Sequence, residues 1–293
     1  MADLRKLLHA HGIRPRKKLG QNFLTDAGRI DEVITAADVQ PGDTVVEVGP
    51  GLGTLTTRLA DRAKRVIALE LDQGIIPALT EATKDYTNLE IRHEDVLKTD
   101  TGLLPRPYKV IANVPYYITS KILEHFLAGD NKPDTMTVTI QKEVAERVVA
   151  GPPKMSVLAI SVQLYGNPQI AAQIPRQAFW PVPEVDSAVL RITDIGKNLS
   201  QVLGDVTEAE FFSTVRAGFA EKRKQLHNTL ARNAGVSHED AVEVLRQEGI
   251  MPTRRAETLT IPEWVSVTRA LKALGSNKAP LSTKRQRGIN RTL

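Results

Sequence analysis

Residues 44–53, Thr44-Val45-Val46-Glu47-Val48-Gly49-Pro50-Gly51-Leu52-Gly53, join a short β-rich run to a glycine turn. Thr44 to Val48 is predicted to form a strand, and a helix is predicted over Leu52 to Ala63, where leucines recur on one face. Glycines at such a turn let a ligand approach the backbone. The spacing is Gly-x-Gly-x-Gly, which differs from the Gly-x-Gly-x-x-Gly of a dinucleotide site. The stretch therefore predicts an α/β fold with a ligand crevice at this turn.

Short β-rich runs alternate with helical stretches from this turn to about Asp194. The further strands expected in the alternating part are Arg65–Glu70, Leu89–Arg92, Val110–Ala112 and Thr135–Ile140. Residues 155–164 are apolar nearly all round and are interpreted as a buried helix. Gln169–Ile174 and Ser187–Ile192 follow as an antiparallel pair. The pattern predicts an α/β, doubly wound, Rossmann-like sheet with an antiparallel terminal strand in a domain formed by residues 1–194, which includes an N-terminal extension.

The strand pattern ends after Asp194, and the rest of the chain is helical in character. Helices are predicted over Glu208–Asn233, His238–Gln247 and Ile261–Leu274, the last with a proline at its second residue, where a helix tolerates it. Residues 195–276 are therefore predicted to form a small all-α C-terminal domain. Residues 277–293 are predicted to be a basic, disordered tail.

Acidic residues are predicted at the ends of three successive strands. Glu47 precedes the glycine turn, Glu70 ends the second strand, and Asp95 follows the third. A carboxylate at the turn would repel a pyrophosphate and favour a sulfonium or an amino group. Glu70 is placed to accept hydrogen bonds from ribose hydroxyls, and Asp95 to accept one from an adenine amino group. Each acid alone is more often a solvated loop residue, but together they favour S-adenosylmethionine over NAD as the cofactor.

The four residues Asn113-Val114-Pro115-Tyr116 follow the predicted strand Val110–Ala112. They present an amide, backbone carbonyls and an aromatic ring where a parallel strand opens into the crevice. These groups suit the binding of a planar, weakly nucleophilic amino group, such as the exocyclic nitrogen of adenine. The alternative is that Asn-x-Pro-Tyr is only a turn after a strand. Taken alone, the motif leaves both interpretations open.

The composition excludes several classes of protein. The 293 residues contain no cysteine, which excludes disulfides and thiolate metal sites. It also excludes methylation at a pyrimidine ring carbon by a thiolate nucleophile. No run approaches the roughly 18 apolar residues of a membrane span, and the N-terminal residues lack the apolar core of a signal peptide. We therefore expect a cytoplasmic protein that does not bind membranes.

The net charge of +5 is concentrated in clusters. Basic residues gather in 14–18, in the triplet Lys222-Arg223-Lys224 and in the tail 281–293. Such clusters are typical of proteins that bind a polyanion, which makes nucleic acid the expected partner. The alternative is a solvated surface that only keeps the protein in solution.

Motifs along nearly the whole chain resemble the KsgA-type (RsmA) small-subunit ribosomal RNA adenine N6-dimethyltransferases. These are, besides Asn113-Val-Pro-Tyr116 and the glycine turn, Lys17-Lys-Leu-Gly-Gln-Asn-Phe-Leu24, Phe179-Trp-Pro-Val-Pro-Glu-Val-Asp-Ser187, the basic helix motif in 219–230, and Arg254-Arg-Ala-Glu-Thr-Leu259. The segment 150–155 departs from the family because it is shorter than the usual linker. That departure puts in doubt any substrate contact made by this loop.

The resemblance implies roles for individual residues. Cofactor-binding positions would be Asn22, Leu24 through its backbone, Gly49, Gly51, Glu70, Asp95 and Asn113. Asn113, Pro115 and Tyr116 would be catalytic, with the target amino group held by the Asn113 oxygen and by the carbonyl of Val114 or Pro115. Substrate-binding residues would be Phe179, as the second stacking face opposite Tyr116, and Lys222, Arg223 and Lys224. Neither a metal nor a dedicated general base is expected.

The resemblance also implies a partner, ribosomal RNA within a small-subunit assembly intermediate, and a monomeric enzyme. One alternative is the large-subunit methyltransferase group of the macrolide-resistance type, which the segment 254–259 disfavours. Another is a non-catalytic binding relative of the mitochondrial-transcription-factor kind, against which the intact glycine turn, Glu70, Asp95 and Asn113 argue. A DNA adenine methyltransferase is disfavoured because its motif usually has two adjacent prolines.

Overall fold

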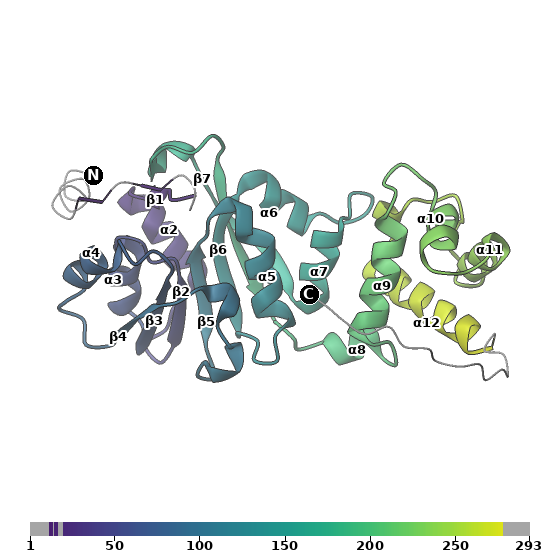
Figure 1. Ribbon diagram of the computed structural model, residues 1–293, viewed down its shortest axis with the longest axis horizontal. Helices are drawn as coiled ribbons and strands as arrows, with labels where there is room; N and C mark the ends of the chain where they lie inside the picture. The colour runs from purple at the N-terminus through teal and green to yellow at the C-terminus, as the bar shows by residue number, and fades with distance from the viewer. Residues whose placement is uncertain (1–11, 14, 17–19, 278–293) are drawn as a thin grey trace, which may run out of the picture. The chain divides into compact units, whose positions relative to one another are not determined.

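The structure is a computed structural model that describes residues 12–13, 15–16 and 20–277 (Figure 1). The chain divides into two compact units, one ending at Val202 and the other beginning at Leu203. The first unit contains every strand of the described residues. The basic N-terminal cluster apart from Arg16, and the tail 278–293, lie outside the described residues. No helix in the described part of the chain is long and apolar enough to cross a membrane.

A seven-stranded sheet forms the centre of the first unit, in the order β4-β3-β2-β5-β6-β9-β7. Its strands are β2 (Thr44–Val48), β3 (Arg65–Glu70), β4 (Leu89–His93), β5 (Lys109–Asn113), β6 (Thr135–Gln141), β7 (Asn167–Ile174) and β9 (Ser187–Thr193). Neighbours from β4 to β6 are parallel, whereas β9 is antiparallel to both β6 and β7. The predicted fold class is confirmed. β9, the last strand of the described residues, lies between β6 and β7 and not at the sheet edge.

Helices cover both faces of this sheet (Figure 1). The helices of the first unit are α2 (Ala27–Ala37), α3 (Thr54–Ala60), α4 (Ile76–Ala82), α5 (Thr119–Ala128), α6 (Lys142–Val149) and α7 (Val157–Tyr165). On one face, α2 and α3 bury side chains such as Val33 and Leu59 against the strands. Each is 0% exposed, and burial of such a side chain contributes about 1.5–3 kcal/mol. On the other face, α6 and α7 pack against each other and the strands.

Helix α3 begins at Thr54, two residues later than predicted. Gly51 and Gly53 adopt the left-handed backbone conformation, so the right-handed helix can start only after Gly53. A two-stranded sheet was not predicted. In it β1 (Phe23–Leu24) pairs antiparallel with β8 (Phe179–Trp180). This pairing brings the N-terminal segment over the glycine turn, and the Phe23 ring lies against Gly51.

The second unit is helical, with α9 (Glu208–Phe219), α10 (Leu226–Asn233), α11 (His238–Gln247) and α12 (Ile261–Asn277), while α8 (Leu199–Leu203) lies at the boundary. The prediction of one helix over 208–233 is wrong. The chain turns at 220–225, and the first amide of α10, that of Leu226, donates to the carbonyl of Arg254 at 2.7 Å. Lys222, Arg223 and Lys224 therefore lie in an exposed turn and not on a helix.

Candidate active site

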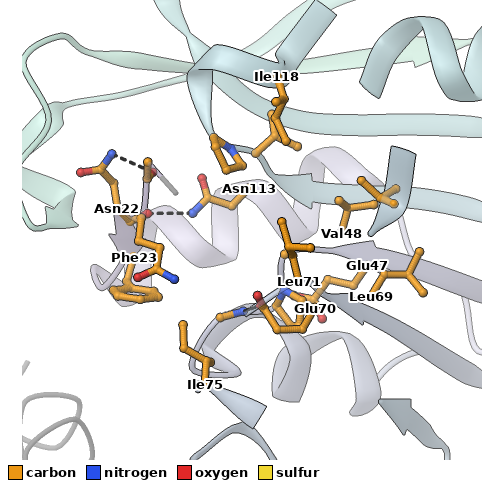
Figure 2. Close-up of a pocket in the computed structure, with 18 of the residues that line it drawn as sticks. Asn22, Phe23, Glu47, Val48, Leu69, Glu70, Leu71, Ile75, Asn113 and Ile118 are labelled. Atoms are coloured by element: carbon orange, nitrogen blue, oxygen red, sulfur yellow. Dashed lines mark hydrogen bonds between the residues drawn. The ribbon is translucent and has the colours of Figure 1, made fainter. Parts of the chain in front are cut away.

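A cavity lies at the carboxyl ends of β2, β3 and β5, and encloses about 1100 Å³ of empty space when its open mouth is included (Figure 2). The strand order reverses here, since β2 has β3 on one side and β5 on the other. Ligands of open α/β sheets bind at such a reversal. The cavity therefore occupies the position where the sequence predicted a crevice.

The glycine turn shapes one wall of the cavity. Gly49, Gly51 and Gly53 have φ angles of +70°, +58° and +81°, which side chains with a Cβ rarely adopt. A Cβ on Gly51 would lie 3.0 Å from the Phe23 ring, so the ring would have to move by a few tenths of an ångström to admit one. The amide of Gly49 donates to the carbonyl of Leu69 at 3.0 Å, which ties the turn to β3.

Glu70, at the end of β3, links the turn to its own strand. Its Oε2 accepts from the amide of Gly51 at 3.1 Å, and its Oε1 accepts from the amide of Asp72 at 2.8 Å. Burial raises the pKa of this carboxyl, and the amide hydrogen bonds oppose that shift because they stabilise the charged form. Each oxygen keeps a further lone pair that can accept from a ligand hydroxyl.

Glu47, in β2, is 1% exposed and lines the cavity. Burial raises the pKa of its carboxyl to about 8; the nearby Thr56 hydroxyl opposes this shift, and the charge of Glu70 adds to it. Its Oε2 has no hydrogen-bond partner within the described part of the chain. A buried acceptor without a partner is unfavourable, so Glu47 would be stabilised by a cationic or hydrogen-bond-donating ligand in the cavity.

Asn113 ends β5, where its side-chain nitrogen donates to the backbone carbonyl of Asn22 at 3.1 Å (Figure 2). This bond assigns the orientation of the amide, because a carbonyl can only accept. Oδ1 of Asn113 is thereby left as an acceptor. Asn22 and Asn113, 91 residues apart in the chain, thus meet at the cavity wall.

Tyr116 begins the 3-10 helix Tyr116–Ile118, and its hydroxyl shares a hydrogen bond of 2.9 Å with Ser187, which is 0% exposed. Burial raises the pKa of the Tyr116 phenol. The backbone amide of Ile118, the last residue of this short helix, donates to the carbonyl of Pro115 at 3.2 Å. The side-chain bond of Tyr116 to Ser187 holds the ring at the cavity wall.

The remaining predicted residues of the first unit also line the cavity. Leu24 is 3% exposed, and its carbonyl accepts from the Thr54 hydroxyl at 3.1 Å. Asp95 caps the 3-10 helix Val96–Lys98 by accepting from the amide of Leu97 at 3.1 Å. Phe179 is 3% exposed and packs within the core. Lys222, Arg223 and Lys224 belong to the second unit and do not line the cavity.

Sequence reasoning missed Asp72, and it interpreted Tyr117 as a structural residue. Asp72 is 5% exposed and fixes the N-terminal segment by accepting from the Gln21 side chain. Tyr117 lines the cavity, is 61% exposed and lies against Gly20. The signal for Asp72 was its position two residues after Glu70, where the strand has just ended.

Three features together define the class of methyltransferases. They are a Rossmann-like sheet in the order described, a glycine turn without the dinucleotide spacing, and an Asn-x-Pro-Tyr turn beside it. Comparison with known proteins identifies the family within this class. Residues 12–272 match the family model described as ribosomal RNA adenine dimethylase. The chain belongs to this family, and the prediction made from the motifs is confirmed. Members of the family are S-adenosylmethionine-dependent, so membership implies this methyl donor.

Individual relatives agree with the assignment. The chain is 46% identical to a ribosomal RNA small subunit methyltransferase A of Dehalococcoides mccartyi, with 90% of this chain and 91% of the relative covered. It is 41% identical to a protein of the same description from Pelotomaculum thermopropionicum, with 91% and 94% covered.

Two solved structures resemble this one over 86% of the chain. A dimethyladenosine transferase of Plasmodium falciparum is 27% identical, with 98% of that chain covered and a TM-score of 0.74. The 23S rRNA methyltransferase ErmE is 26% identical, with 100% covered and a TM-score of 0.68. The large-subunit type is therefore a more distant relative than the small-subunit proteins at 41–46% identity.

Proposed function

We propose that this protein transfers methyl groups from S-adenosylmethionine to the exocyclic N6 of adenines in small-subunit (16S) ribosomal RNA, and that the product is dimethyladenine. The observation that carries the proposal is the Asn113 amide, held by the Asn22 carbonyl beside the glycine turn with its oxygen left to accept. The higher sequence identity to small-subunit methyltransferases supports small-subunit RNA, and not large-subunit RNA, as the substrate.

The residues of the cavity fit S-adenosylmethionine. The unpartnered Oε2 of Glu47 suits the cationic methionine part, next to Gly49 and Gly51. Glu70 would hold the ribose and Asp95 the adenine amino group, while Asn22 and the backbone of Leu24 would close over the cofactor. When bound, the cofactor supplies an electrophilic methyl group on a sulfonium. The chain itself supplies binding and orientation.

The target amino group is a poor nucleophile because its lone pair is delocalised into the adenine ring. Its two N–H groups would donate to Oδ1 of Asn113 and to a neighbouring carbonyl. We assign this second role to Val114, since the Pro115 carbonyl already accepts from the amide of Ile118. Pro115 then serves by fixing the course of the backbone. Such bonds favour a more tetrahedral nitrogen, and positioning supplies much of the rate.

Methyl transfer requires the target base to leave its stack, which costs a few kcal/mol. Stacking on an aromatic side chain returns about 1–3 kcal/mol per base. Tyr116, anchored by Ser187, is the face we expect to contribute more. Phe179 remains the proposed second face, although its 3% exposure means that only a small part of the ring is accessible.

We propose that the substrate is ribosomal RNA within a small-subunit assembly intermediate in the cytoplasm, and that the enzyme acts as a monomer. The exposed turn with Lys222, Arg223 and Lys224 supports a polyanion partner. The three residues are consecutive and exposed, and none of them forms an ion pair with an acid in the part of the chain that the structure describes. Phosphate contacts of this kind give affinity without reading the sequence.

The test incubates the protein with labelled S-adenosylmethionine and with undermethylated small or large ribosomal subunits. Label on small-subunit adenines, recovered as dimethyladenine, is the expected result. Label on the large subunit would instead favour the macrolide-resistance type of activity. Cofactor titration in parallel identifies a purely RNA-binding relative, because such a protein would bind RNA without binding the methyl donor.

A further inference from the structure

Asp72 is a buried carboxylate that gathers three donors just outside the cavity. Its side chain is 4% exposed. Oδ1 accepts from the amide of Gly74 at 3.0 Å and lies 3.0 Å from Nη1 of Arg16. Oδ2 accepts from Nε2 of Gln21 at 2.8 Å. The other end of the Gln21 amide is also engaged, since its Oε1 accepts from the backbone amide of Arg16 at 2.7 Å.

Gln21 is adjacent to Asn22, whose carbonyl orients the Asn113 amide. The segment Gln21–Asn22 is thus held on two sides, by Asp72 after β3 and by Asn113 at the end of β5. Asp72 also donates its backbone amide to Glu70. Gln21 and Asn22 line the cavity, whereas Asp72 does not.

The geometry points to Asp72 as a positioning residue for methyl transfer, one that holds Gln21–Asn22 so that the Asn22 carbonyl can orient Asn113. This inference rests on the proposed function. A merely local role would be the turn that Asp72 makes with Gly74, but that turn uses Oδ1 alone. Within the described residues Oδ2 accepts a hydrogen bond only from Gln21, and a charge-assisted hydrogen bond of this kind is stronger than a neutral one.

An exchange of the two side-chain types tests this role. In the double variant Gln21→Glu with Asp72→Asn, the new amide at 72 can donate to the new carboxylate at 21. Every other acceptor of the pair is kept, because position 21 still offers Oε1 to Arg16 and position 72 still offers Oδ1 to Gly74. Each single variant breaks the bond instead. Gln21→Glu places two carboxylates opposite each other, and Asp72→Asn places two amide nitrogens opposite each other.

The measurements are calorimetric titration with S-adenosylhomocysteine and the thermal midpoint of each variant. We expect each single variant to bind about tenfold more weakly, the size of one lost hydrogen bond to a charged group, and the double variant to regain wild-type affinity. Glu90→Gln is the matched control, because it also removes a paired carboxylate of this unit but not one near the cavity. It should leave the affinity unchanged.

Single variants that bind as tightly as the wild type, or a double variant that shows no recovery, would overturn the role of Asp72. A wild-type protein that fails to bind S-adenosylhomocysteine at all would instead remove the proposed function, and with it this inference. Should the Asp72 variants not fold, Gln21→Met removes the same donor at a partly exposed position, and unchanged binding there would also overturn the role.

Discussion

The side-chain nitrogen of Asn113 donates to the backbone carbonyl of Asn22 across 3.1 Å, and this bond leaves Oδ1 of Asn113 as the free acceptor. An aspartate at position 113 would keep an acceptor but lose the donor, and its second oxygen would face the carbonyl of Asn22. Asn113→Ala therefore tests the loss of the whole amide, whereas Asn113→Asp tests the loss of the donor that orients the acceptor.

We expect Asn113→Ala to lower kcat by at least about a hundredfold, the scale of one removed group that stabilises a transition state, and to leave RNA binding unchanged. Asn113→Asp should also be inactive because its carboxylate is repelled by the Asn22 carbonyl. Incorporation of labelled methyl groups and filter binding of RNA measure the two properties. Asn167→Ala, at an exposed position away from the cavity, is the control. An active Asn113→Ala enzyme would contradict the role of the amide.

The exposed turn between α9 and α10 gives a second prediction. Replacement of Lys222, Arg223 and Lys224 by glutamine should weaken RNA binding and flatten its dependence on salt by up to roughly three phosphate contacts, or about 0.7–0.9 in the log–log slope for each contact. The measurement is RNA affinity over a series of salt concentrations.

The control for the turn removes the same charge from cations of the second unit that already pair with acids. These are Arg232 with Glu221, Arg269 with Asp205 and Lys272 with Glu210. If this control triplet flattened the salt dependence as much as the turn does, net charge and not the turn would determine binding.

The sequence predicted those parts of the fold that local pattern encodes. Apolar runs such as Val66–Leu69 mark buried parallel strands, and the carboxyl ends of such strands meet at one edge. The sequence alone therefore predicts that Glu47, Glu70 and Asn113 lie close together. The structure places all three at one cavity.

Elements that depend on distant partners could not be predicted in this way. Strand β1 has only two residues, and its partner Phe179–Trp180 lies more than 150 residues away. The break between α9 and α10 was missed because a helical pattern continues through it, whereas the turn is stabilised by the bond from Leu226 to Arg254. The bonds of Asp72 to Gln21 and Arg16 are likewise tertiary.

Gly218 gives a prediction about the stability of the second unit. A Cβ at this position in α9 would lie 2.3 Å from Cη2 of Trp264, which is 0% exposed. Gly218→Ala should destabilise the unit by about 1–3 kcal/mol, as overpacking of a core does. Thermal unfolding measures the change. Gly151→Ala, where a Cβ would meet nothing within 4 Å, should have little effect. Equal midpoints for both variants would show that Trp264 can move aside.

Glu47 should make stability depend on pH. Its folded pKa, about 8, exceeds the ordinary value of 4.5, so the folded protein keeps a proton that the unfolded chain releases. The contribution of Glu47 to stability is therefore largest below pH 4.5 and falls by at most about 1.4 kcal/mol per pH unit up to pH 8. Glu47→Gln should remove this fall, as measured by urea unfolding from pH 5 to 8.

For Glu90→Gln we expect no such effect, because Arg92 and Arg65 lower the pKa of Glu90. Parallel curves for wild type and Glu47→Gln would show that Glu47 is ionised throughout this range.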